Sequence, residues 1–309
     1  MGRMTQAIVF TEYGGPEVLR LVDVEPPRPA AGQVLVRVRA AGVQPFDNLF
    51  RTGEAARYMP ATFPQQVGNE LAGVIDAVGP GVTAWAVGDE VLGWVALAAF
   101  ADLAVVGEHD LVRKPAAMPW TEAGALSASG QTAHTALEDL AVAAGETLLV
   151  HAAAGGVGSM AVQIARALGA IVIGTAGPRN HDYLRALGAV PVAYGSGLVD
   201  RVRALAPDGV HAVLDAVATE ESLTVSRELA AADRIGTVGF NPLSERLGVR
   251  RLGSRRSAER LAELTRLWED GALRVTVRSY PLDQAAEAHR AVGTGHVRGK
   301  VVLVANGGN

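Results

Sequence analysis

The chain has 309 residues, a formal net charge of −4 and no cysteine. Without cysteine it forms no disulfide, no thiolate metal site and no cysteine nucleophile. The small negative charge gives no general attraction to nucleic acid or anionic membranes, and no apolar run reaches the ~18 residues of a membrane span. Residues 1–10 lack the apolar core of a secretory signal. We therefore expect a cytoplasmic protein of about two domains.

Residues 1–122 form a β-rich part. Short runs rich in valine, leucine and isoleucine alternate with turns of glycine and proline, a pattern typical of a barrel or sandwich. In the run 34–39 the valines fall on one face, which predicts a half-buried strand. The predicted strands are Ala7–Phe10, Leu19–Val24, Val34–Arg39 and Ala72–Val78.

Residues 123–271 have a different pattern, in which helical stretches alternate with short β-branched runs. This alternation predicts a doubly wound parallel sheet, and hence an α/β protein. The predicted strands are 147–151, 171–174, 190–194, 210–214 and 234–238. The predicted helices are 157–168, 179–187, 198–205, 220–229 and 258–270.

The last part, residues 272–309, reads as a strand (274–278), a helix (283–292) and a final strand (300–304). The β-rich part needs a closing strand, and this terminus can return to supply it.

The most informative segment is the run from Thr147 to Gly158. A buried apolar strand leads into a turn of small residues, 152–158, which opens a helix. Free N–H groups and the dipole at a helix start favour a pyrophosphate. A side chain at Gly155 would hold the ligand off, and one at Gly158 would push the helix from the strand. Ala153 replaces the first glycine of the G-x-G-x-x-G fingerprint, so a turn without a ligand is the alternative.

The stretch after the next strand bears on the choice of cofactor. NAD sites usually place an acidic residue ~20 residues after the turn, where it binds the ribose. Here residues 174–181 contain no acid and offer Thr175, Arg179 and His181. Arginine matches the charge of a 2′-phosphate, so this loop favours NADPH. The alternative is that Arg179 is a solvated residue at a helix start.

Motifs along nearly the whole chain resemble the medium-chain dehydrogenase/reductase superfamily, most closely its zinc-free, zeta-crystallin-like quinone oxidoreductases. Each motif is weak alone, but their order and spacing together are specific. They lie at residues 12–19, 32–36, 41–43, 68–70, 78–79, 87–91, 130–133, 152–158 and 295–300.

The resemblance implies a GroES-like β-barrel domain at 1–122, completed by 272–309, and a Rossmann domain at 123–271, with the active site in the cleft. It also implies hydride transfer from NADPH to a quinone or an α,β-unsaturated carbonyl, and a homodimer. The residues it assigns to the cofactor are Thr132 near the nicotinamide, Ala154, Gly155, Gly156, Val157 and Gly158 in the turn, Thr175, Arg179 and Tyr194 toward the 2′-phosphate, Val238, Gly239 and Phe240 at the carboxamide, and Lys300.

The chain departs from this family at several places. Zinc-dependent relatives have Cys at the place of Gln44 and His at the place of Asn69, so we expect no catalytic zinc. Quinone-reductase relatives often have Asn and Tyr where this chain has Gln44 and Leu49. We interpret Gln44 as the catalytic residue, an amide that polarises the substrate carbonyl. Asn69 and Glu70 are expected to bond to backbone.

Two charged patterns remain. Asp47 and Arg51 are spaced to form an i,i+4 ion pair, with a polar wall of the cleft as the other interpretation. The run Arg246 to Arg256 has three interpretations, namely recognition of an acidic substrate or phosphates, a subunit edge, or a solvated face.

Two other functions stay open. One is an enoyl reductase acting on a biosynthetic or carrier-tethered intermediate, whose acidic carrier the arginine run would meet. The other is a non-catalytic, crystallin-like NADPH-binding protein. The expected partners are a small-molecule electrophile and a second copy of the chain, with no nucleic acid or membrane.

Overall fold

The computed structural model describes residues 4–305, which divide into two compact units. Of the described residues, the first unit comprises 4–128, Ser257–Thr265 and 275–305, and the second comprises Ser129–Arg256 and Arg266–Arg274. The residue ranges of helices α2 (Trp120–Asp139) and α8 (Ala258–Glu269) each include a boundary between the segments of the two units.

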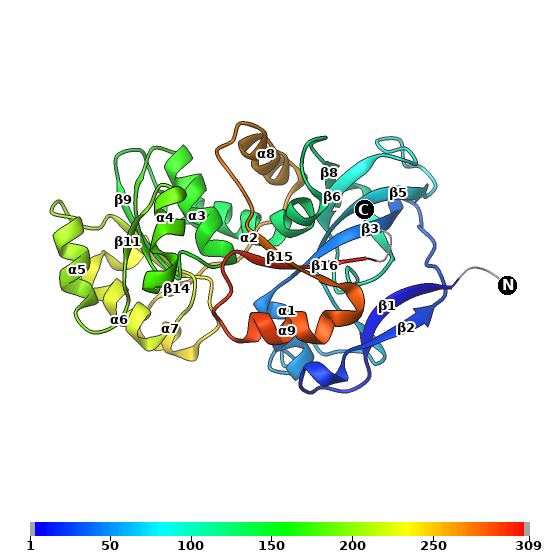
Figure 1. Ribbon diagram of the computed structural model, residues 1–309, viewed down its shortest axis with the longest axis horizontal. Helices are drawn as coiled ribbons and strands as arrows, with labels where there is room; N and C mark the ends of the chain where they lie inside the picture. The colour runs from blue at the N-terminus through cyan, green and yellow to red at the C-terminus, as the bar shows by residue number, and fades with distance from the viewer. Residues whose placement is uncertain (1–3, 306–309) are drawn as a thin grey trace. The chain divides into compact units, whose positions relative to one another are not determined.

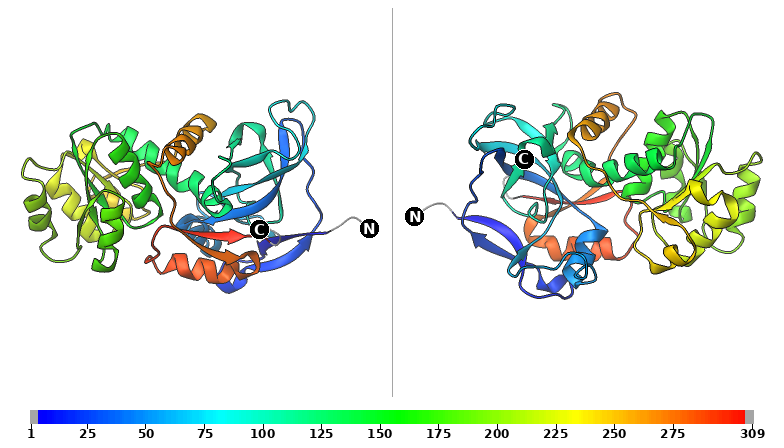
Figure 2. Two further views of the ribbon diagram at one scale, coloured as in Figure 1. Left: turned by 45° about the horizontal axis from the view of Figure 1, so that its top comes forward. Right: turned by 180° about the vertical axis from the view of Figure 1, so that it is seen from behind.

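The second unit is built on a parallel sheet of six strands in the order β11-β10-β9-β12-β13-β14. Helices lie on both sides of it (Figures 1 and 2), so the central strand β9 is buried along its whole length. The strands are β9 (Thr147–His151), β10 (Ile171–Thr175), β11 (Val190–Val192), β12 (Ala212–Asp215), β13 (Ile235–Thr237) and β14 (Arg250–Arg251). The helices are α3 (Gly156–Ala167), α4 (His181–Ala186), α5 (Leu198–Leu205), α6 (Glu220–Leu229) and α7 (Pro242–Arg246).

The alternation of side chains along β9 explains its burial. Leu149 joins a cluster with residues of α5 and α6, while Leu148 and Val150 point to the opposite face and are fully buried there. This is the doubly wound arrangement predicted from the sequence. β9, α5 and α6 have the predicted bounds, and the other four predicted strands, β10 to β13, differ by one or two residues at their ends. The sequence did not predict β14 or α7.

The first unit contains a sheet of seven strands in the order β15-β16-β3-β5-β6-β8, with β7 paired to β3, and a smaller sheet β2-β1-β4. Its strands are β1 (Thr5–Phe10), β2 (Arg20–Val24), β3 (Gln33–Val43), β4 (Gln65–Gln66), β5 (Glu70–Val78), β6 (Glu90–Trp94), β7 (Leu103–Gly107), β8 (Leu111–Arg113), β15 (Val277–Pro281) and β16 (Lys300–Val304). Its helices include α1 (Pro45–Thr52) and α9 (Ala285–Gly293).

The C-terminal strand β16 pairs antiparallel with β3, with Val301 opposite Val43, and appears beside it in Figure 1. The strand predicted at 274–278 lies three residues later, because β15 begins only at Val277. The backbone before it is bonded elsewhere: Arg274 N–H donates to Gln163 Oε1 and Val275 N–H donates to Glu122 Oε2. Among the described residues, no helix combines the length and the hydropathy needed to cross a bilayer.

Candidate functional site

The turn between β9 and α3 is tied to the end of β10. Ala152 adopts a left-handed conformation (φ 52°), and its N–H donates to Thr175 Oγ1 (3.1 Å). Ala153 N–H donates to the Thr175 carbonyl oxygen (3.0 Å). The first residues of α3, Gly156 to Gly158, have N–H groups without intrahelical acceptors, as at any helix start. The turn therefore presents backbone donors on a fixed frame, at the carboxyl edge of the sheet.

The two glycines of this turn differ in what surrounds them. A Cβ on Gly158 would lie 2.8 Å from Ala153 Cα and 3.0 Å from the Ala152 carbonyl carbon, which are backbone atoms. A Cβ on Gly155 would meet only the Ala152 carbonyl oxygen, at an ordinary 3.4 Å. Position 158 is thus a close approach of helix to strand, as predicted, while position 155 faces open space. A group such as a diphosphate fits this cradle.

The strand order places the turn at the topological switch point. From β9 the chain builds outward through β10 and β11 on one side, then returns to β12 on the other. In doubly wound sheets ligands bind at the carboxyl edge where the direction reverses.

The loop after β10 contains the residues expected to face a 2′-phosphate. Thr175 is buried and its hydroxyl accepts the Ala152 N–H, so this side chain supports the turn. Arg179 is exposed, and Tyr194 is 55% exposed. The Tyr194 hydroxyl lies beside Gly177 of this loop, 3.4 Å from the position that a Cβ on Gly177 would take. The nearest acid, Asp182, forms an exposed pair with Arg185.

Other predicted cofactor residues also belong to the second unit. Val238 and Gly239 follow β13, and Gly239 N–H donates to Thr237 Oγ1 (3.1 Å). Phe240 is 53% exposed, with the Arg251 guanidinium 4.1 Å from its ring centre. Thr132 lies in α2 and is half-buried.

Gln44 and Lys300 belong to the first unit, where they meet in a buried polar cluster. Gln44 Nε2 donates to Glu70 Oε1, and Lys300 Nζ lies 2.8 Å from the same oxygen. The other carboxylate oxygen of Glu70 accepts the Ala128 N–H (2.7 Å). The sequence predicted the backbone bond of Glu70 but missed its contacts with Gln44 and Lys300. The three residues are far apart in the chain, because Gln44 precedes α1, Glu70 begins β5 and Lys300 begins β16.

Asp47 forms the second half of this cluster. Its carboxyl accepts the Gln44 N–H (2.7 Å) and the Asn69 Nδ2–H (2.8 Å). Burial raises the pKa of Asp47 to about 7, with Glu70 adding to the rise, while these hydrogen bonds and the Lys300 charge oppose it. The expected ion pair with Arg51 is wrong: Arg51 donates to the Gly14 carbonyl oxygen and to His289 Nδ1.

The cluster does not suit zinc. Its donors at the two positions occupied by Cys and His in zinc-dependent relatives are carboxamides, which are poor ligands beside thiolate and imidazole. Lys300 also brings a positive charge to this place. Within residues 4–305, no group of three or more His, Asp or Glu side chains is arranged to hold a metal ion.

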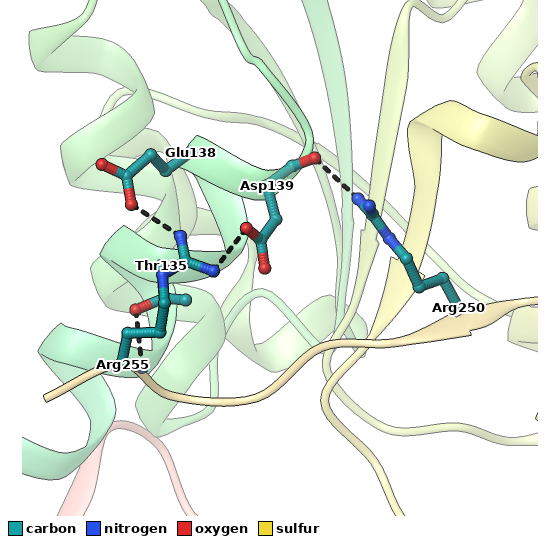
Figure 3. Close-up of polar contacts among 5 residues, drawn as sticks. All are labelled: Thr135, Glu138, Asp139, Arg250 and Arg255. Atoms are coloured by element: carbon teal, nitrogen blue, oxygen red, sulfur yellow. Dashed lines mark hydrogen bonds and ion pairs between the residues drawn. The ribbon is translucent and has the colours of Figure 1, made fainter.

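Two arginines of the run, Arg250 and Arg255, form polar contacts within the second unit (Figure 3). The Arg255 guanidinium forms ion pairs with Glu138 (2.8 Å) and Asp139 (2.6 Å). The backbone N–H of Arg255 donates to Thr135 Oγ1. Arg250 donates to the carbonyl oxygen of Asp139 at the end of α2. These two arginines anchor their segment to α2.

Comparisons with known proteins agree with this architecture. Residues 30–137 match the family described as alcohol dehydrogenase GroES-like domain, and residues 187–303 match the family described as zinc-binding dehydrogenase. The human quinone oxidoreductase is 30% identical, and the alignment covers 98% of each chain. Erythronolide synthase EryA2 of Saccharopolyspora erythraea is 38% identical over 91% of this chain, which spans only 8% of that protein.

Two solved structures have the same fold. The quinone oxidoreductase of Escherichia coli, complexed with NADPH, has a TM-score of 0.85 at 28% identity and covers 97% of this chain and 99% of its own. The CurK enoyl reductase has a TM-score of 0.86 at 26% identity and covers 98% of this chain and 99% of its own. The chain therefore belongs to the medium-chain dehydrogenase/reductase superfamily, in its quinone oxidoreductase-like branch, with a Rossmann sheet and a GroES-like domain.

Proposed function

We propose that the chain is a zinc-independent, NADPH-dependent oxidoreductase that reduces a quinone or an α,β-unsaturated carbonyl. One observation carries the proposal: at the switch point of the sheet, Gly158 is packed against backbone while Gly155 faces open space. A packing role alone explains Gly158, but it does not explain why position 155 also lacks a side chain.

The residues of the second unit would hold the cofactor, which supplies the hydride when bound. The helix start at Gly156 to Gly158 donates N–H groups to the diphosphate. Arg179 and Tyr194 bind the 2′-phosphate, because residues 174–181 contain no acid to bind a bare ribose. The backbone of residues 238–240 holds the carboxamide, and Thr132 adjoins the nicotinamide. Thr175 acts by holding the turn.

In the first unit, the Gln44 carboxamide would contact the substrate or the nicotinamide carboxamide, and the buried cluster around it would keep its orientation. The substrate is a small electrophile. We further propose a cytoplasmic homodimer, since β14 is an edge strand with exposed residues that a second copy can pair with.

The test is stopped-flow oxidation of NADPH by 1,2-naphthoquinone and by a simple enone, with NADH as the comparison. We expect turnover with NADPH and a weaker response with NADH. Tight NADPH binding without turnover of any electrophile would instead support the non-catalytic, crystallin-like alternative.

A second candidate is an enoyl reductase acting on a carrier-tethered or biosynthetic thioester. The likeness to the CurK enoyl reductase and to part of a polyketide-forming synthase favours it. Because Arg250 and Arg255 are bonded to α2, an acidic carrier would need to meet other arginines of the run. A trans-2-enoyl thioester reduced faster than the quinone at equal concentration would select this candidate.

A further inference from the structure

Glu70 is a fully buried carboxylate for which the fold makes room. Its side chain has no exposed surface, and that of Lys300 is 3% exposed. Gly42 stands beside it on β3, where a Cβ would lie only 2.7 Å from the Glu70 carboxyl carbon. A side chain at position 42 would therefore displace the carboxylate from its three partners.

The ion pair with Lys300 is not explained by stability. Taking two charges out of water costs about as much as their attraction returns, so a buried pair is weak support for a fold. The Lys300 ammonium lies 2.8 Å from Glu70 Oε1, yet its nitrogen forms no hydrogen bond with that oxygen. Lys300 thus serves as a counter-ion, while the directional bonds of Glu70 go to Ala128 and Gln44.

The charge on Glu70 and the first turn of α1 together set which way round the Gln44 carboxamide lies. An ionised carboxylate only accepts hydrogen bonds, so the nitrogen of Gln44 must face it. The carbonyl oxygen lies on the other arm, where the Asp47 N–H uses one of its two lone pairs and leaves the second for another donor. A neutral amide at position 70 both donates and accepts, and it would allow Gln44 to turn over. Asp47 holds the Gln44 backbone N–H, so the side chain starts from a fixed point.

We propose that Glu70, with Lys300 as its counter-ion, is a positioning residue that makes Gln44 offer its carbonyl oxygen to a hydrogen-bond donor of the bound cofactor or substrate. This inference rests on the proposed function and deepens it. It assigns Gln44 an acceptor role toward an N–H or O–H group, such as a carboxamide or a hydroquinone hydroxyl.

The experiment compares four proteins: wild type, Glu70→Gln, the double variant Glu70→Gln/Lys300→Met, and the control Glu90→Gln. The double variant removes both buried charges, so it tests the role even if the single variant folds poorly. Glu90 is a matched control, since its carboxylate also pairs with a buried lysine, Lys114 (3.0 Å), but does not touch Gln44. We expect the double variant to keep its fold while kcat falls about 10-fold or more, and the control to match wild type.

The KM values separate the two possible donors. In Glu70→Gln, which keeps Lys300, a rise in KM for NADPH places the donor on the cofactor. A fall in kcat with both KM values unchanged places it on the hydroquinone hydroxyl, which forms only during reduction because the quinone itself has no donor. A folded double variant with wild-type kcat and both KM values unchanged would overturn the proposal.

A second readout does not need activity. In the ¹⁵N NMR spectrum, the side-chain amide of Gln44, assigned with Gln44→Ala, should exchange slowly in wild type and in Glu90→Gln but rapidly in the double variant. Rapid exchange in wild type would refute the positioning role. If the wild-type protein turns over no electrophile while this protection is observed, the proposed function fails and the positioning of Gln44 stands.

Discussion

The two glycines of the β9–α3 turn allow the packing role and the binding role to be separated. A methyl group at position 158 would lie 2.8 Å from Ala153 Cα and 3.0 Å from the Ala152 carbonyl carbon, both well inside ordinary contact. Both of these atoms belong to the backbone. Since neither the strand nor the helix moves freely, the clash costs about 1–3 kcal/mol. For a domain of this size, that corresponds to a fall in Tm of about 2–12 °C. We expect Gly158→Ala to lose stability in this range and to bind NADPH poorly.

Gly155→Ala is the matched variant. Gly155 has φ −79° and ψ −178°, which alanine adopts without strain, and its Cβ would make only an ordinary contact. Its Tm should stay level or rise slightly, because alanine restricts the unfolded chain. Its new methyl group points toward the open side, so the Kd for NADPH should rise by ~10-fold, or about 1.4 kcal/mol.

Calorimetry for binding and thermal unfolding for stability measure the two effects. An unchanged NADPH affinity in Gly155→Ala would contradict the placement of the diphosphate. An unchanged Tm in Gly158→Ala would contradict the packing argument.

Three further predictions follow from individual side chains. Arg179→Ala should weaken NADPH binding by ~10-fold and leave NADH binding unchanged, with Arg185→Ala as a neutral control; equal losses for both cofactors would rule out a 2′-phosphate contact. Arg255→Ala should lower Tm slightly at low salt and not at about 1 M NaCl, because its two ion pairs are exposed; a loss independent of salt would argue against an ionic anchor. Burial, aided by Arg51, lowers the pKa of His289 to about 3. In the unfolded chain the His289 imidazole takes up a proton below pH ~6.5, whereas in the folded chain it stays neutral down to about pH 3. The free energy of unfolding should therefore fall by up to about 5 kcal/mol as the pH drops from 6.5 toward 3. His289→Gln should flatten the slope of Tm against pH.

The order of helices and strands from β9 to β13 could be predicted from local patterns, whereas the short elements α7 and β14 were not predicted. β9 has the predicted bounds because its apolar run ends at a turn of small residues, and α6 begins where the Thr219 hydroxyl accepts the Ser222 N–H. Gly158 was also predictable, since a helix that starts directly after a strand needs a close approach there. Such features depend on residues within a few positions of one another, and sequence periodicity records them.

The polar cluster of the first unit could not be predicted from local sequence patterns. Gln44 precedes α1, Glu70 begins β5 and Lys300 begins β16, and no periodicity links positions so far apart. Asp47 illustrates the consequence: its spacing to Arg51 satisfied the helical rule for an ion pair, but Arg51 binds Gly14 and His289, and Asp47 binds Asn69. Spacing along a helix predicts which partners a side chain can reach. Burial and long-range strand pairing decide which of them it contacts, because a buried polar group must bond to the groups that the fold places next to it.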